Sequence, residues 1–285
     1  AAAWRITSTP LLPSGDEPHY LVIAQSLWRD GDLRIQNNHD RGDYREYFDR
    51  DLQPHYLTRG RDGEVYSIHP IGLPVLLAPV YAAGGYRLVV LALVLTGAGA
   101  AAGAWRLARR IAGSAEAATL AWLGIALSVP FVFNAFSVYP EVVGSLLVVF
   151  AFGTGLPRDD DGGTGVARWW LTGLALAALP WLASKYVLMT AALAVVAGAR
   201  AVWPIAAPPS GPPAVRWRTA WPRLAGIAVP GAIGAAAWFA FFQWIWGSPL
   251  PSAPYGALLQ TSPRYLGFGA PGLLFDQEYG IVTYA

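Results

Sequence analysis

The sequence predicts an all-α fold, a polytopic transmembrane helical bundle with an outer amphipathic juxtamembrane helix and a long extracytoplasmic first loop. Composition is the first reason, since 54% of the 285 residues are hydrophobic and only 13% are charged, with a mean hydropathy of +0.37. Soluble domains contain about 25% charged residues. The order of segments is the second reason, because long apolar runs begin only after a polar region of 70 residues.

The net charge and the cysteine count exclude several kinds of partner and site. The net charge of +2 is too small to suggest nucleic-acid binding, so we expect membrane lipids and no nucleic acid as partners. The chain has no cysteine, which excludes disulfides and thiolate metal sites. Lys185 is the only lysine among 20 basic residues. The start without methionine and the apolar run at the end lead us to expect one transmembrane domain, 1–285, that is incomplete at both ends.

The polar region, 1–70, is expected to hold one helix and a long loop outside the membrane. It contains 8 Arg and 11 Asp or Glu residues. A helix is predicted over 17–29, because spacings of three and four place apolar side chains on one face, those of Leu21, Ala24, Leu27 and Trp28. Residues 30–69 are rich in Asp, Gly and Asn and predict a loop. Interleaved aromatic residues indicate that this loop is ordered: Tyr44, Tyr47, Phe48, Tyr56 and Tyr66.

The apolar part, 71–246, is predicted to contain six spans. Residues 71–84 are too short to cross a bilayer, which takes about 20 helical residues. They should form a buried or interfacial helix that leads into the first span through Gly84 and Gly85. The predicted spans are 86–107, 117–138, 141–156, 168–184, 186–203 and 224–246. Residues 247–280 are expected to form a second extracytoplasmic loop.

Basic residues in the connections set the expected orientation. With the polar region outside, nine arginines fall in the inner connections: Arg106, Arg109, Arg110, Arg158, Arg168, Arg200, Arg216, Arg218 and Arg223. The later outer segments hold only three basic residues: Arg87, Lys185 and Arg264. Positively charged connections tend to stay in the cytoplasm, so this bias predicts that the polar region faces the opposite side.

Sparse ionisable residues gather at the outer end in this topology. They are Asp16, Glu17, His69, Glu141, Lys185, Arg264, Asp276 and Glu278. Each also has a purely structural explanation. Asp16 can cap the helix that Glu17 begins, and Lys185 can extend its ammonium group from the bilayer toward water. The others can be ordinary first-turn or loop residues.

The order of several motifs resembles a known group of membrane enzymes. The chain has GDEPHYL before the predicted helix, YSIHPIGLPVLLAPVYAAGG before the first span, WRLARRIAG at the end of that span and SVYPE at the start of another. These motifs resemble the GT-C superfamily of glycosyltransferases, in particular bacterial proteins akin to the protein O-mannosyltransferases and the lipid A aminoarabinose transferases. The resemblance covers about residues 14–200. It implies a multi-pass glycosyltransferase of the bacterial plasma membrane, with its active site facing away from the cytoplasm.

The resemblance also implies roles for the gathered residues. It implies a polyprenyl-phosphate-linked sugar as donor and a carboxylate at Asp16 that deprotonates the acceptor hydroxyl, with Glu17 as the second candidate catalytic residue. The candidate substrate-binding residues are Tyr20, His69, Glu141, Lys185 and Arg264. His69 stands where the aminoarabinose transferases carry a Lys-Pro-Pro stretch, so this chain differs from them at a phosphate-binding position.

The residue types suit this chemistry, and two other functions stay open. A carboxylate can take the proton of an acceptor hydroxyl on a lipid, glycan or protein, and Lys185, Arg264 or a divalent metal ion can neutralise the leaving phosphate. A transporter or flippase of lipid-linked sugars would need ionisable residues deep in the spans, where the sequence has almost none. A catalytically silent membrane scaffold is the third interpretation, and substitution of Asp16 separates it from the first.

Overall fold

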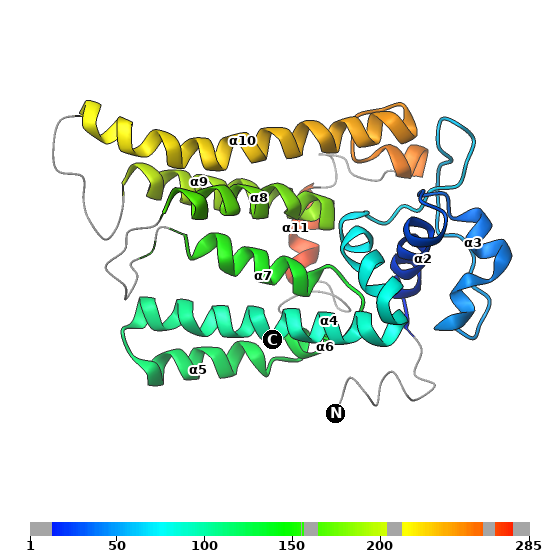
Figure 1. The fold of residues 1–285 in the computed structure, drawn as a ribbon, viewed down its shortest axis with the longest axis horizontal. Coiled ribbons are helices and arrows are strands. Elements are labelled where there is room, and N and C mark those ends of the chain that lie inside the picture. The colour runs from blue at the N-terminus through cyan, green and yellow to red at the C-terminus, as the bar shows by residue number, and fades with distance from the viewer. Residues whose placement is uncertain (1–12, 155, 157–164, 204–212, 259–265, 276–285) are drawn as a thin grey trace.

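The computed structural model describes residues 13–154, 156, 165–203, 213–258 and 266–275. Within these ranges the regular structure is helical, with a single β-bridge between Arg34 and Tyr66. Long apolar helices lie side by side in a bundle, and residues 13–71, here called the head module, pack at one end of it (Figure 1). The prediction of an all-α fold is confirmed for the described residues.

The head module is built around α2 (Glu17–Arg29), which has the bounds predicted from the sequence. The predicted apolar face of this helix is confirmed only in part. Leu21 and Ala24 are fully buried as expected, but so is the polar Gln25, whereas Trp28 is 56% exposed. The reason is that the following loop folds over the polar side of α2 and supplies partners there: the Gln25 side-chain amide donates to the carbonyl of Asp43 at 3.0 Å.

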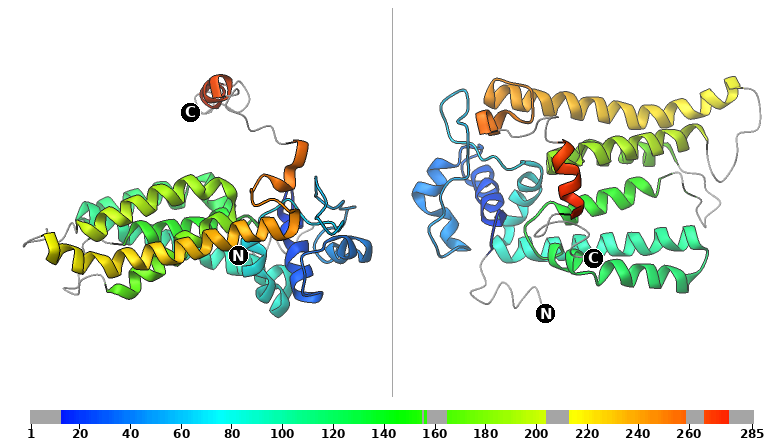
Figure 2. Two further views of the ribbon diagram at one scale, coloured as in Figure 1. Left: turned by 90° about the horizontal axis from the view of Figure 1, so that it is seen from above. Right: turned by 180° about the vertical axis from the view of Figure 1, so that it is seen from behind.

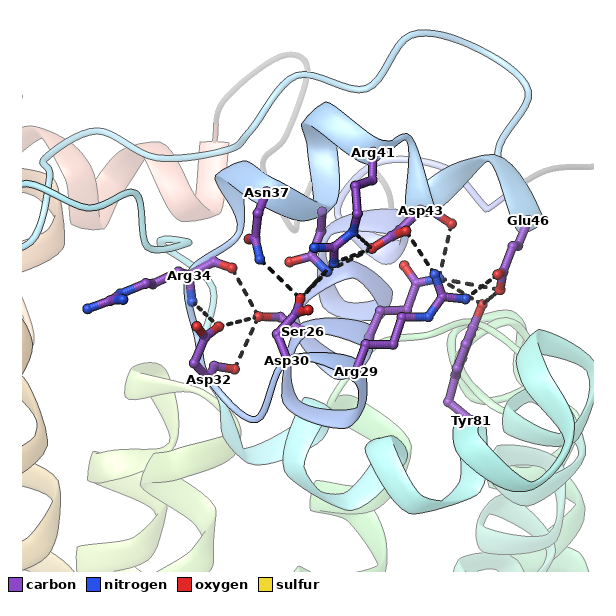
Figure 3. Close-up of polar contacts among 12 residues, drawn as sticks. Ser26, Arg29, Asp30, Asp32, Arg34, Asn37, Arg41, Asp43, Glu46 and Tyr81 are labelled. Atoms are coloured by element: carbon purple, nitrogen blue, oxygen red, sulfur yellow. Dashed lines mark hydrogen bonds and ion pairs between the residues drawn. The ribbon is translucent and has the colours of Figure 1, made fainter.

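The segment predicted as a loop contains α3 (Gln36–Arg41) and the short 3₁₀ helix η1 (Asp43–Glu46). Its aromatic residues hold it in place, since Tyr44 and Tyr47 are buried, and the predicted order of this segment is confirmed. Charged side chains complete the attachment (Figure 3). Arg29 of α2 pairs with Asp43 at 2.8 Å and also with Glu46.

Asp43 is the centre of this network. Its buried carboxylate contacts Arg29 and, at 2.8 Å, Arg41, and it accepts a hydrogen bond from Asn38 at 2.9 Å. Burial alone would raise the pKa of Asp43, but the hydrogen bonds from Arg41 and Asn38 and the charges of Arg29 and Arg41 lower it overall. The folded head module therefore favours the ionised form of this carboxylate.

We expect Asp43→Asn to destabilise the head module by about 2 kcal/mol at pH 7, since it removes charge-assisted hydrogen bonds from a buried site. Because the folded pKa of Asp43 lies below the unfolded value of about 3.9, its contribution is present above that pH and is lost as the pH falls through the folded pKa. Thermal unfolding of the two proteins should therefore differ at pH 7 and converge in acid. Asp40→Asn, at an exposed position of α3, is the control. An equal difference at both pH values would contradict the assignment.

The bundle begins with α4 (Gly72–Ala112), which leads away from the head module (Figure 1). The predicted junction is confirmed, because Gly84 and Gly85 leave helical geometry within α4, and Gly85 has φ +62°, a value that glycine adopts without strain. The chain then turns at each end of the bundle through successive helices: α5 (Ala115–Ala126), α6 (Val129–Asn134), α7 (Glu141–Phe152), α8 (Val166–Leu182), α9 (Val187–Val202) and α10 (Pro213–Trp246). The short η2 (Ser184–Tyr186) joins α8 to α9.

Three of the described helices are long and apolar enough to cross a membrane: Gly72–Ala112, Ser184–Val202 and Ala220–Trp246. The helices α5, α7 and α8 are apolar but shorter. The predicted span 117–138 is not one helix, since it is divided between α5 and α6 at Leu127 and Ser128. Ser128 is extended and Pro130 follows two residues later; proline lacks the N–H that a continuous helix needs.

Small residues let α8 and α10 approach closely, as is common between helices in membranes. A Cβ atom at Gly173 of α8 would overlap the carbonyl oxygen of Gly226 of α10. One turn further along α8, Ala177 occupies the space beside Gly234, where a Cβ would come within 2.7 Å of the Ala177 Cβ. These contacts fix the two helices against each other along most of α8.

The last described segments lie after α10. They are the 3₁₀ helix η3 (Ala253–Leu258) and α11 (Leu266–Phe275). Figure 2 shows α11 set apart from the bundle in the view from above. The range 247–280, predicted as a second loop, therefore contains helical structure in its described part.

Candidate functional site

The site begins at the turn before α2, which is fixed against the segment that precedes α7. Gly15 has φ +59°, and a Cβ atom there would lie 2.6 Å from the hydroxyl oxygen of Tyr139. That hydroxyl accepts a hydrogen bond from the backbone N–H of Asp16 and donates one to the carbonyl of Ser14, both at 3.2 Å. Only glycine fits this turn without moving Tyr139.

The two adjacent carboxylates of the turn point in different directions. Glu17 is buried, and its carboxylate accepts hydrogen bonds from the backbone N–H groups of Val138 at 2.7 Å and Ser14 at 3.2 Å. Burial raises the pKa of Glu17 above its ordinary value, although both hydrogen bonds favour the charged form. In this position Glu17 joins the head module to the bundle, which is a positioning role.

Asp16 is oriented differently, with its side chain 50% exposed. It stands at the position that caps α2, yet its side chain makes no capping hydrogen bond, so the structural explanation given above for Asp16 is wrong. Its carboxylate lies beside His69, whose Nε2 is 3.9 Å from a carboxylate oxygen of Asp16. Among the described residues, this carboxylate is therefore open to a substrate or a metal ion.

Three of the four histidines of the chain, His19, His55 and His69, gather beside Asp16 and are here called the histidine cluster. His55 Nδ1 and His69 Nε2 are 2.9 Å apart, and the His19 ring lies 5.0 Å from the His55 ring and 5.4 Å from the His69 ring. Burial and the neighbouring histidines lower the pKa of His19 to about 3 and that of His69 to about 4. Ligand atoms of Asp16, His55 and His69 all lie within 4.8 Å of one another, which suits a metal ion.

Tyr20 connects this cluster with the next group of predicted residues. Its buried ring lies 5.0 Å from the His69 ring and 6.4 Å from the Tyr139 ring. Burial raises the pKa of Tyr20, and the charges of Asp16 and Glu141 add to this effect. Glu141 begins α7 two residues after Tyr139, whose hydroxyl contacts the Asp16 backbone, so both carboxylates lie at one end of the bundle.

Glu141 and Lys185 form an ion pair at that end. Their closest atoms are 2.7 Å apart, and the Lys185 side chain is 64% exposed. The second carboxylate oxygen of Glu141 is buried and has no hydrogen-bond partner among the described residues. We also expect one cavity that is lined by Asp16, Glu141 and Lys185, and that expectation stays a prediction.

Sequence reasoning found part of this arrangement. Arg264, predicted to bind substrate, lies outside the described residues, as do Asp276 and Glu278. His19, His55 and the hydrogen bonds of Tyr139 were missed. A sequence signal for the two histidines exists, because Pro-His-Tyr-Leu occurs twice, at 18–21 and 54–57, in a chain with only four histidines.

Comparison with known proteins adds no assignment to this geometry. No protein-family model matches the chain, and no curated protein or solved structure matches it.

Proposed function

We propose that the chain is an integral-membrane glycosyltransferase that moves a sugar from a polyprenyl-phosphate donor to a hydroxyl group of a lipid, glycan or protein acceptor. The observation that carries this proposal is the Asp16 carboxylate. It is half-exposed, free of hydrogen bonds from the described residues, and held on a rigid turn at the end of an apolar bundle. A carboxylate in this position is suited to take a proton from a substrate that meets a lipid there.

The reaction gives Asp16 and Lys185 different tasks, one on the acceptor and one on the donor. Asp16 accepts the proton of the acceptor hydroxyl, whose oxygen forms a bond to the anomeric carbon while the bond from that carbon to the phosphate oxygen breaks. We assign Lys185 as the cation that neutralises the departing phosphate. Its ammonium group has three N–H donors, and Glu141 is its ion-pair partner in the described part of the chain.

An apolar pocket supports a lipid-linked donor. It has a volume of about 310 Å³ and is lined by residues of α4, α7 and α8, among them Val75, Leu147 and Trp181. Ile71 also lines this pocket and lies two positions after His69 in the chain, so the pocket begins next to the histidine cluster in sequence. A prenyl chain in this pocket would bring the attached phosphate toward the head module.

The orientation of this enzyme follows from its arginines. The end of the bundle opposite the head module carries Arg109 and Arg110 at the end of α4, Arg200 at the end of α9 and Arg218 in the first turns of α10 (Figure 1). The positive-inside tendency favours this end as cytoplasmic, so we assign the head module to the outer face of the bacterial plasma membrane.

Photolabelling of the purified protein with a photoreactive polyprenyl-phosphate analogue tests the donor class. We expect labelled residues to include Val75 or Leu147, and an excess of unmodified polyprenyl phosphate to suppress the label. Leu120 and Leu188 are controls, because they are 71% and 82% exposed on the bundle and would face bulk lipid in a membrane. Labelling of the controls alone, or labelling that excess lipid does not reduce, would contradict the proposal.

A further inference from the structure

We propose that Asp16, His55 and His69 form a zinc-binding site that keeps one coordination position open toward the outside. Each residue contributes one ligand atom, and the three come from separate segments of the head module: the turn before α2, the middle of the first loop, and the residues before α4. This site shares Asp16 with the proposed glycosyltransferase, but zinc binding can be measured without any sugar substrate.

The distances fit a tetrahedral ion. Zinc bonds to imidazole nitrogen and carboxylate oxygen are about 2.0–2.1 Å long, so neighbouring ligand atoms in a tetrahedron are about 3.3 Å apart. Two of the three separations fall on either side of this value, at 2.9 Å between His55 Nδ1 and His69 Nε2 and at 3.9 Å between His69 Nε2 and Asp16. The third, between His55 and Asp16, lies within 4.8 Å. Both edges to Asp16 would have to shorten on binding, and its side chain is half-exposed, so that it has room to rotate.

The frame around these ligands is held by the backbone. The N–H of Ile68 donates to the carbonyl of His55 at 3.1 Å, which ties the two histidine-bearing segments together. The N–H of His69 donates to the Ser67 hydroxyl at 3.2 Å, and Tyr139 fixes the backbone of Asp16 as described above. Ligands that are held in place before the ion arrives lose little conformational freedom when it binds.

The ligand types decide between metals. Mg²⁺ and Ca²⁺ prefer oxygen ligands, whereas two imidazoles and one carboxylate suit Zn²⁺ and related transition metals. Three protein ligands and an open position are typical of catalytic rather than structural zinc sites. A hydroxyl group bound at the open position would lose its proton more easily. The proposed acceptor would then bind beside the second oxygen of Asp16, which is not one of the ligand atoms and can take the proton.

Another buried nitrogen lies next to the site. His19 Nδ1 is buried without a hydrogen-bond partner among the described residues, and its ring stacks on that of His69. His19 is not within the group of ligand atoms, so we assign it to packing the ligand ring in place.

The test is zinc binding by the purified protein after chelation and dialysis, followed by calorimetric titration with Zn²⁺ and, in parallel, Mg²⁺. We expect one equivalent of Zn²⁺ per chain and no competition from Mg²⁺. His55→Ala and His69→Ala should each lower the zinc affinity at least about 100-fold. His39→Asn is the matched control, because His39 lies outside the cluster and binds the Leu52 carbonyl through Nδ1, a contact that asparagine can keep.

Asp16→Asn covers the case in which a histidine variant fails to fold, since the Asp16 side chain makes no hydrogen bond that the fold needs. It should fold normally and bind zinc more weakly. Folded wild-type protein that takes up no zinc would mean that His55 and His69 are only a hydrogen-bonded pair, which overturns the proposal. Unchanged affinity in Asp16→Asn and in both histidine variants would overturn it as well. Wild-type protein that binds zinc but transfers no sugar would contradict the proposed glycosyltransferase and leave the zinc site in place.

Discussion

Asp16→Asn should lower the rate of sugar transfer by about 10²–10⁴-fold, the usual loss when a general base is removed. That range corresponds to roughly 3–5 kcal/mol of transition-state stabilisation. Folding should survive, because the Asp16 carboxylate makes no capping hydrogen bond and is half-exposed. Initial rates and thermal unfolding midpoints of the same purified samples are the measurements. A variant with full activity would remove Asp16 from the mechanism.

Glu17→Gln is the matched control, since it changes the adjacent carboxylate in the same way. Glu17 holds two backbone N–H groups, and glutamine has only one acceptor oxygen for them. We expect a loss of about 1–2 kcal/mol in stability and nearly normal transfer by the folded fraction. The reverse pattern, with Glu17→Gln inactive but stable and Asp16→Asn active, would exchange the roles of the two acids.

The second large effect is expected in the bundle, where Gly173→Leu should destabilise the protein by about 3 kcal/mol or more. Overpacking in a well-packed interior typically costs 1–3 kcal/mol. At this position the added side chain meets the backbone of Gly226 rather than a movable side chain. α8 and α10 must therefore separate. Thermal unfolding in detergent and resistance to proteolysis measure the loss.

Gly231→Leu is the control for this change. Gly231 also lies in α10, but nothing lies within 4 Å of the Cβ position there, and it faces an apolar pocket of about 270 Å³ between α8, α9 and α10. Leucine at 231 should leave stability unchanged or raise it slightly. Similar losses in both variants would show that the effect comes from leucine in α10 or α8 in general and not from the close contact at Gly173.

The spacing of apolar residues and the positions of glycine and proline predicted the fold where neighbouring residues determine it. The bounds of α2 and the junction at Gly84 and Gly85 follow from residue types that act within a few positions. The division of the span 117–138 was missed, although Pro130 was visible, because hydropathy over a long window does not register one missing N–H. The burial of Gln25 was also not predictable, since its partners lie 18 residues away in Asp43 and 56 residues away in Tyr81.

The sequence indicated several residues of the candidate site, but it did not indicate what each of them does. Asp16, Glu141 and Lys185 were placed at one end by topology alone. The difference between Asp16 and Glu17 depends on the Val138 N–H, more than 100 positions away, and adjacent carboxylates look alike in the sequence. The histidine cluster forms through contacts between α2 and two loop segments far from each other in the sequence. His69 was predicted, whereas only the repeated Pro-His-Tyr-Leu segment indicated His19 and His55.

Transfer in proteoliposomes tests the central claim most directly. The purified protein is reconstituted with a set of polyprenyl-phosphate sugars, and mass spectrometry follows the release of free polyprenyl phosphate together with the appearance of a glycosylated acceptor. We expect the wild type to consume at least one donor, Lys185→Ala to consume it more slowly at low donor concentration, and Asp16→Asn to consume almost none. Folded wild-type protein that leaves every donor intact, or donor consumption that Asp16→Asn matches, would contradict the assignment of this site to sugar transfer.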